Sequence, residues 1–403
     1  MKQANHHQRY DALDNMRVLA FGVLILYHIG MYYVADWGWH IKSDVQFVWL
    51  QDVMILTNQW RMSLLFLISA MVLGAVLSRR PALSCLKERT QRLLLPLVFG
   101  MFVVVAPQAY VEGRVNGLVS ISFWEFYGHY INPATDYLPD EQSVIGLLTW
   151  NHLWFLPYLF CYSVIVAGLY PLLTRVISRL PGWTDHVAVF LPLVVTATTY
   201  IWLNLREAYP VTHDLISDWY NHAKYGLVML VGMVIVNRPL LWRNVVQHRR
   251  VLLLIAMCTY TLLILDRHGV LGDIPAREEA PFWLWPLIGG IVTGNHWCWL
   301  GAILGYGSRY LARPSSVTRY FNQAVLPYYM LHQTLIVVLA YVLSSTLLPA
   351  SLSFLLILAG TVVGCMLSYE GIKRVPGLRS LFGLKGRVSA SSPTASRFSP
   401  LKG

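Results

Sequence analysis

The chain has 403 residues, of which 56% are hydrophobic and only 13% are charged. Soluble domains average about 25% charged residues, so this composition excludes an ordinary water-soluble domain and indicates a polytopic membrane protein. The formal net charge of +11 comes from basic residues dispersed between apolar runs. No basic stripe with interleaved aromatics is present, so a nucleic-acid partner is not expected.

The alternation of apolar runs and charged loops predicts an all-α integral membrane protein, a bundle of about ten transmembrane helices. The expected spans are residues 17–35, 52–77, 93–111, 147–171, 187–204, 223–241, 251–266, 283–306, 322–343 and 351–371. Twenty-four Lys and Arg residues fall on one side of these spans and six on the other, with Arg61 inside a span. The positive-inside rule therefore places both termini in the cytoplasm.

This topology divides the chain into three parts. A cytoplasmic N-terminal segment, residues 1–16, precedes a membrane domain, residues 17–371. A basic cytoplasmic tail, residues 372–403, follows, and its Ser-rich end is expected to be partly disordered.

The first span carries two ionisable residues on one face. Arg17 stands at its entrance and His28 follows eleven residues later. Eleven residues make about three helical turns, so both side chains point the same way, about 16 Å apart. His28 is then near mid-bilayer, where an ionisable group is costly and is a candidate functional residue. The alternative is a core histidine bonded to a neighbouring carbonyl.

Arginines also mark the second and third spans. The polar stretch 58–61 interrupts the second span, and its Arg61 must face protein or a water-filled cavity. The alternative is a structural ion pair with an acid such as Asp52. Before the third span, Arg89 and Arg92 are three residues apart, so on a helix they form one cationic face suited to phosphate. Lipid head-group anchoring would explain the same pair.

The longest outer loop, residues 112–146, carries aromatic residues among acids, including Trp124 and Tyr130. Flat rings stack on sugar faces and carboxylates bond sugar hydroxyls, so this loop is predicted to bind carbohydrate. An interfacial aromatic belt is the alternative.

Two further spans contain histidines. His152 and Trp154 open the fourth span, where they either line a pocket or anchor the interface, and Pro157 behind them is expected to kink the helix. The polar residues 295–297 are expected to break the eighth span. The ninth span holds a second intramembrane histidine, His332.

Several motifs, taken together and in order, resemble the membrane acyltransferase-3 family over nearly the whole chain. They are Arg-x10-His in the first span (Arg17, His28), Arg-x-x-Arg before the third (Arg89, Arg92) and HLWFL at residues 152–156. Within the family, RMSLLFLISA (61–70), YFNQAVLPYYMLHQ (320–333) and YEGIKRVPGLRSLF (369–382) are similar to the periplasmic glucan succinyltransferase branch.

One position departs from the family pattern. The family usually has Ser-Gly in the second span, where this chain has Ser69-Ala70. A methyl group where backbones approach closely is expected to narrow a substrate path.

The resemblance implies an integral membrane O-acyltransferase in the bacterial inner membrane. It would move a succinyl or acetyl group from a cytoplasmic acyl-CoA-type donor to a hydroxyl of a periplasmic or cell-envelope glycan or glycolipid. Acyl-CoA is then a co-substrate, and no bound cofactor or metal is expected.

The resemblance also assigns roles. The predicted catalytic residues are His28, as a base or a transient acyl carrier, and Arg17, which would bind phosphate or orient the donor, while Arg89 and Arg92 would hold the donor's phosphates. The acceptor or pocket residues are Arg61, His152, Trp154, His332, Trp124 and Tyr130.

Two other classes stay open. A carrier or flippase for an acyl or glycan-lipid substrate would also place His and Arg in the membrane. It should show inverted repeats or paired broken helices, and the sequence has no evident internal symmetry. A non-catalytic sensor is disfavoured because the Arg-x10-His and Arg-x-x-Arg motifs are intact.

Overall fold

The computed structural model describes residues 2–313 and 315–384, with side chains from residue 11 onward. Every regular element in this part is helical, and the only β contacts there are two isolated bridges, Val34 with Phe47 and Ser143 with Gly146. The α-helices are α1 (Lys2–Tyr33), α2 (Val48–Asn58), α3 (Arg61–Leu77), α4 (Ala82–Arg89), α5 (Leu95–Phe99), α6 (Ala106–Val115), α7 (Phe123–Tyr130), α8 (Phe155–Arg179), α9 (Val187–Leu205), α10 (Trp219–Asn237), α11 (Pro239–Arg267), α12 (Leu284–Tyr310), α13 (Ser316–Ser344), α14 (Ala350–Ile372) and α15 (Pro376–Leu381). Two π-helical segments, η1 (Thr90–Leu94) and η2 (Gly100–Val104), and three short 3₁₀ turns, η3 (Pro139–Glu141), η4 (Asn151–Trp154) and η5 (Gly182–Asp185), complete them.

The all-α membrane architecture predicted from the sequence is confirmed. Within the described residues, nine helical stretches are long and apolar enough to cross a membrane. The expected span at 223–241 corresponds to α10, which falls short of that apolarity because Asn221, His222 and Lys224 occupy its first two turns. With 19 residues, α10 is about 28 Å long, close to the thickness of the hydrocarbon core.

Two of the predicted spans are assembled from shorter pieces. The second is split between α2 and α3 at Gln59 and Trp60, where the sequence has its polar interruption. The third forms one rod from Ala82 to Val115, in which α4, α5 and α6 are joined by η1 and η2. π-Helical turns are wider than α-helical ones and occur often at functional sites.

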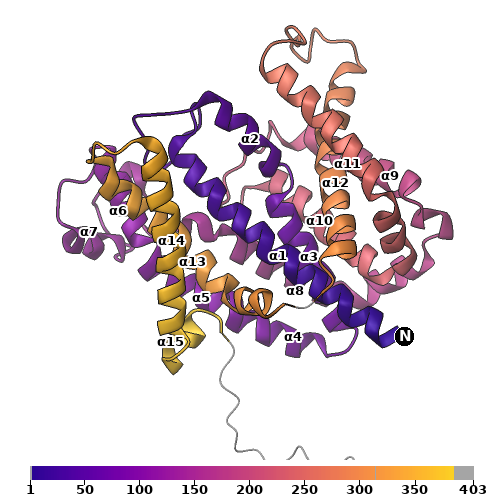
Figure 1. Ribbon diagram of the computed structural model, residues 1–403, viewed down its shortest axis with the longest axis horizontal. Helices are drawn as coiled ribbons and strands as arrows, with labels where there is room; N and C mark the ends of the chain where they lie inside the picture. Colours follow the sequence, from indigo (N-terminus) through magenta and orange to yellow (C-terminus); the bar gives the residue numbers. More distant parts are fainter. Residues whose placement is uncertain (1, 314, 385–403) are drawn as a thin grey trace, which may run out of the picture.

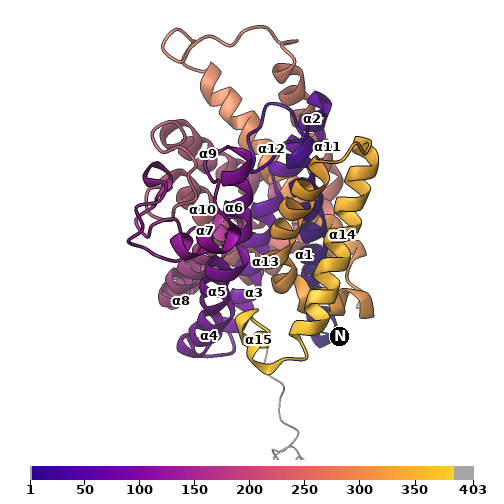
Figure 2. The ribbon, with the colours of Figure 1, turned by 90° about the vertical axis from the view of Figure 1, so that its left-hand side faces the viewer.

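The long helix α1 is the centre of the bundle, packed against α2, α3, α12, α13 and α14 (Figure 1). The start of α1, α4 and α15 lie together at one end of the molecule, here called the basic end (Figure 2). The α1–α2 connection and the tip of the α11–α12 hairpin lie at the opposite end. Both ends of the described chain therefore lie at the basic end of the bundle.

Two breaks expected from the sequence are absent. Helix α12 continues through its polar residues, because Asn295 donates to Ala256 O (2.7 Å) and Trp297 to Thr198 Oγ1 (2.7 Å) on neighbouring helices. Pro157 lies in the first turn of α8, where a backbone N–H has no helical partner, so it introduces no kink. The predicted cytoplasmic tail, residues 372–403, contains the short helix α15. The Ser-rich end of the tail, which is expected to be partly disordered, falls in residues 385–403 and lies outside the described part.

Candidate active site

A pocket of about 290 Å³ lies among α1, α3, α4, α8 and α13 at the basic end. Arg17, Arg89 and Arg92 line it together with one carboxylate, Glu88. We call it the arginine pocket. Its other walls are mainly apolar and aromatic and include Phe21, Leu65, Phe155, Leu156 and Tyr329.

The three guanidinium groups are only partly neutralised. Arg17 pairs with Asp14 at 2.9 Å and bonds Asn322, and its buried Nε has no hydrogen-bond partner. Arg92 lies 3.6 Å from Glu88, and Arg89 makes no hydrogen bond or ion pair with any described residue. The sequence placed these arginines at one membrane surface, and the structure brings all three to one cavity suited to an anion.

Deeper in the bundle, the two intramembrane histidines form a pair. His28 Nδ1 of α1 lies 2.9 Å from His332 Nε2 of α13. His332 Nδ1 lies 2.8 Å from the carbonyl oxygen of Tyr329. Since a carbonyl only accepts, His332 carries its proton on Nδ1, and its Nε2 accepts from His28 Nδ1. This tautomer leaves the lone pair of His28 on Nε2.

The two histidines also differ in solvent exposure, and the difference again favours His28 as the one with an accessible nitrogen. His332 is fully buried, whereas His28 is half-buried. His28 is therefore the member of the pair that can offer a free nitrogen to a reacting group.

One aromatic layer separates the arginine pocket from this pair. Phe21 meets the ring of His332 edge to face, with centroids 5.5 Å apart, and lies 6.5 Å from Tyr329. Both aromatic residues line the arginine pocket. The arginine pocket and the histidine pair thus follow one another along the same face of α1, with a rise of about 16 Å between Arg17 and His28.

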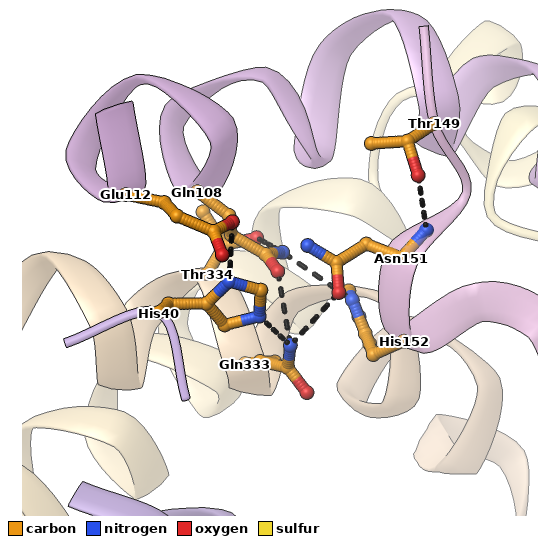
Figure 3. Close-up of polar contacts among 8 residues, drawn as sticks. All are labelled: His40, Gln108, Glu112, Thr149, Asn151, His152, Gln333 and Thr334. Carbon is orange, nitrogen blue, oxygen red and sulfur yellow. Dashed lines mark hydrogen bonds and ion pairs between the residues drawn. The ribbon is translucent and has the colours of Figure 1, made fainter. Parts of the chain in front are cut away.

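On the other side of the pair lies a polar network, shown in Figure 3. His40 Nδ1 donates to Glu112 Oε2 (2.7 Å), and Gln333 Nε2 donates to His40 Nε2 (2.9 Å) and to Gln108 Oε1 (3.1 Å). Gln108 Nε2 in turn lies 3.3 Å from His152 Nδ1. The network runs from the partly exposed Glu112 to the buried His152.

The network ends against the histidine pair. The ring of His152 meets that of His332 at right angles, with centroids 5.4 Å apart, and His152 Nε2 donates to the carbonyls of Tyr329 and Met330. His152 is therefore not an interface anchor but part of the polar core. Asn151 beside it has a positive φ of 45°, a conformation that asparagine tolerates better than most residues.

Sequence reasoning missed most of this network. His40 lies in the connection between α1 and α2, and its partner Glu112 is 72 residues away. The one available signal was polar glutamine in apolar segments, at Gln108 and at Gln333, which follows His332 directly.

The two aromatic residues predicted to bind acceptor have different environments. Trp124 on α7 is 77% exposed, in keeping with a surface that stacks on a sugar. Tyr130 is fully buried and donates to Met101 O (2.9 Å). Tyr130 is therefore not part of the exposed surface of α7, and its ring packs in a small core with Phe126 and Val119.

The alternative explanation of Arg61, an ion pair with Asp52, is not found. Asp52 pairs instead with Arg267 (2.7 Å), and Arg61 lies over the ring of Tyr27, 3.5 Å from its centroid. Trp154 belongs to the neighbouring aromatic cluster, where its ring stacks on His213 with centroids 4.1 Å apart.

Ala70 does not narrow the arginine pocket. It is fully buried against α10, where a Cβ at Gly232 would lie 2.7 Å from that of Ala70. Ser69, its neighbour, lines the pocket. In this close contact the glycine is on α10, and a Cβ at Gly232 would also lie 2.8 Å from the carbonyl oxygen of Leu67, so the two helices approach closely. No group of three or more His, Cys, Asp or Glu side chains suited to a metal ion occurs in the described residues.

Comparison with known proteins agrees with this arrangement. A family model described as an acyltransferase domain matches residues 10–370. Two curated relatives are glucans biosynthesis protein C of Escherichia coli (strain K12) and of Shigella dysenteriae serotype 1 (strain Sd197). Each is 22% identical over 408 residues, which cover 96% of this chain and 98% of the relative. No solved structure matches. The family match spans the arginine pocket, the histidine pair and the apolar helices, and the chain belongs to the acyltransferase-3 family of membrane acyltransferases.

Proposed function

We propose that this protein transfers an acyl group from an acyl-CoA-type donor to a hydroxyl of a cell-envelope glycan or glycolipid. The observation that carries the proposal is the alignment of the arginine pocket with the His28–His332 pair along α1. The name of the relatives, glucans biosynthesis protein C, supports a glucan-related acceptor.

The donor is proposed to bind from the basic end. A second pocket of about 600 Å³ adjoins the arginine pocket, shares Arg92 with it, and is lined by Lys373, Arg374 and Arg379. Phosphates of the nucleotide part would lie among these cations, because guanidinium and ammonium groups bind phosphate oxygens through charge-assisted hydrogen bonds. The extended pantetheine arm would then run through the arginine pocket and carry its thioester toward His28.

The reaction follows from the tautomers of the histidine pair. His28 Nε2 accepts the proton of the acceptor hydroxyl while the hydroxyl oxygen attacks the thioester carbonyl carbon. The carbon–sulfur bond breaks, and His28 returns the proton to the departing thiolate, which leaves an ester and a free thiol. His332 holds the ring of His28 in orientation by accepting from its Nδ1 (2.9 Å). A covalent acyl-His28 intermediate would use the same Nε2 lone pair.

The basic end is proposed to face the cytoplasm. The count of twenty-four Lys and Arg residues on one side of the expected spans, against six on the other, supports this orientation through the positive-inside rule. In a bacterial inner membrane, the donor would thus enter from the cytoplasm. The acceptor would enter from the periplasm, past Trp124 and the polar network.

The test is acyl transfer by the purified full chain in proteoliposomes, supplied with labelled succinyl-CoA or acetyl-CoA and an envelope glycan fraction. Release of free CoA thiol together with an ester of the glycan in the mass spectrum supports the proposal. A carrier would instead move label across the bilayer with the thioester intact, and that result would refute acyl transfer.

A further inference from the structure

Arg61 is a buried cation without a counter-ion. The residue is 5% exposed, and its Nε and Nη1 have no hydrogen-bond partner. No described acid forms an ion pair with it, and its guanidinium group lies over the aromatic ring of Tyr27 in a cation–π contact. A buried charge left without a partner is costly, so such a group points to an anion that arrives with a ligand.

The backbone at this point favours an anion as well. Arg61 is the first residue of α3, a helix of 17 residues, and the N-cap residue Trp60 makes no side-chain capping bond. The positive end of the α3 dipole therefore coincides with the guanidinium group.

Other nitrogen-bearing side chains gather around the same break between α2 and α3. His296 Nδ1 lies 2.6 Å from Gln59 O, and its buried Nε2 has no partner. Lys224, half-buried, lies on α10, which packs against α3.

This site is next to the reacting centre. Arg61 lies over the ring of Tyr27, and this ring meets the ring of His28 edge to face, with centroids 5.8 Å apart. His28 and Arg61 also lie at a similar depth. His28 is 17 residues from Asp11, where the apolar stretch of α1 begins, and Arg61 is 16 residues from the end of α3, so each is about 25 Å from the limit of its apolar stretch toward the basic end.

We propose that Arg61 forms a carboxylate-binding subsite that selects donors whose acyl group ends in a second carboxylate. The inference rests on the proposed function, because it takes His28 as the point where the thioester reacts. The phosphates of the donor are held by other cations at the basic end, so they do not reach this depth. A terminal carboxylate on the acyl chain is the anion that arrives here with the reacting carbonyl, and one such group neutralises one guanidinium.

The test compares two probes of equal chain length. Succinyl-CoA and butyryl-CoA differ only in a terminal carboxylate against a methyl group. The concentration of each that half-maximally raises the melting temperature of the detergent-solubilised full chain measures its affinity. We expect wild type to bind succinyl-CoA about ten- to a hundredfold more tightly than butyryl-CoA, which is the strength of charge-assisted hydrogen bonds. In Arg61→Gln this preference disappears while butyryl-CoA affinity is unchanged, and Arg61→Lys retains part of it.

Arg206→Gln is the matched control, because Arg206 also lies over an aromatic ring, that of Trp202 (4.4 Å), but on the exposed end of α9. It should keep the wild-type preference. The unliganded Arg61→Gln variant should melt close to wild type, since the loss of an unpaired buried charge offsets the lost cation–π contact with Tyr27. Equal affinity of wild type for both probes, or an equal loss for both in Arg61→Gln, would overturn the subsite.

Succinamate and butyramide separate this inference from the proposed function, because each carries an amide in place of the thioester and only succinamate has a terminal carboxylate. If neither CoA thioester binds, the proposed donor is wrong. Stabilisation of wild type, but not of Arg61→Gln, by succinamate and not by butyramide would then still establish the carboxylate site. Equal effects of succinamate and butyramide, with both thioesters bound equally, would remove the carboxylate site while the donor site stands.

Discussion

At the residue scale, the two paired histidines have unequal roles. His332 is fixed by the Tyr329 carbonyl at 2.8 Å and is fully buried, so it has no free nitrogen. His28 keeps the Nε2 lone pair and some accessible surface. The structure thus leaves one of two similar histidines with a free ring nitrogen and fixes the other beside it, and the proposed reaction takes them as the base and the residue that positions it.

This difference predicts the outcome of substitutions in the pair. His28→Gln removes the proton acceptor and should lower kcat by roughly 10²–10⁴-fold, which is what a general base contributes. His332→Leu removes the acceptor for His28 Nδ1, whereas His332→Gln keeps an acceptor there in the form of an amide oxygen. His332→Gln should therefore retain more activity than His332→Leu or His28→Gln. Release of CoA thiol measures all three. His248→Gln, at an exposed position on α11, is the control. Retention of more than about a tenth of wild-type turnover by His28→Gln would refute its role as the base.

The arginine pocket predicts a different kinetic signature. Arg89 makes no hydrogen bond or ion pair with any described residue, so Arg89→Ala should leave stability unchanged and weaken donor binding. The expected loss is about 1.5–3 kcal/mol, the value of hydrogen bonds to a charged group. Arg89→Lys should restore binding only in part, because an ammonium group is not a planar fork.

Donor titrations at saturating acceptor would measure this loss as a rise in KM for acyl-CoA. Arg175→Ala, on the exposed end of α8, controls for the general effect of losing a cation. An equal rise in the acyl-CoA KM of Arg89→Ala and of Arg175→Ala would indicate that Arg89 anchors lipid head groups and does not bind the donor.

At the scale of elements, interruptions in helices create the site. The break between α2 and α3 exposes a helix N-terminus inside the bundle, at Arg61. The π-helical segment η1 carries Arg92 at the wall of both basic-end pockets, and Gly383 closes those walls with a φ of +67°. A Cβ at Gly383 would lie 2.5 Å from Leu326 Cδ2, so only glycine fits this turn.

Helix α7 gives a prediction at this scale, because two of its aromatic residues face opposite ways. Trp124→Ala removes an exposed ring and should raise the acceptor KM without changing the melting temperature. Tyr130→Ala removes a buried ring and should destabilise the protein by about 3–5 kcal/mol, as other large aromatic truncations in cores do. Thermal unfolding and acceptor titrations of both variants distinguish these effects. A melting temperature that falls as far for Trp124→Ala as for Tyr130→Ala would mean that α7 offers no binding surface.

At the scale of the whole molecule, the basic end and the opposite end are predicted to face different compartments. A cysteine in place of Val144, fully exposed in the connection after α7, should react with a membrane-impermeant maleimide in intact cells. A cysteine in place of Arg313, exposed at the end of α12, should react only after the membrane is opened. Cys161 and Cys258, which are not fully buried, should first be replaced by serine. The opposite labelling pattern would invert the topology.

The sequence by itself determined the all-α membrane architecture and the local placement of individual cations. Apolar runs of spanning length leave the backbone no alternative to helices in lipid. Helical periodicity then placed Arg17 and His28 on one face, about 16 Å apart. Because these are properties of a single helix, they do not depend on which helices become neighbours.

Only the tertiary structure decided the chemistry of the site. The contact of His28 with His332 joins residues 304 apart, and that of His40 with Glu112 joins residues 72 apart. Hydropathy is nearly uniform around an apolar helix, so it does not specify which faces of two helices meet. The packing of α1 against α13 therefore set the tautomers of the pair. The pairing of Asp52 with Arg267 likewise left Arg61 alone. Such hydrogen bonds and ion pairs depend on which side chains meet inside the bundle, and no local pattern in the sequence specifies those meetings.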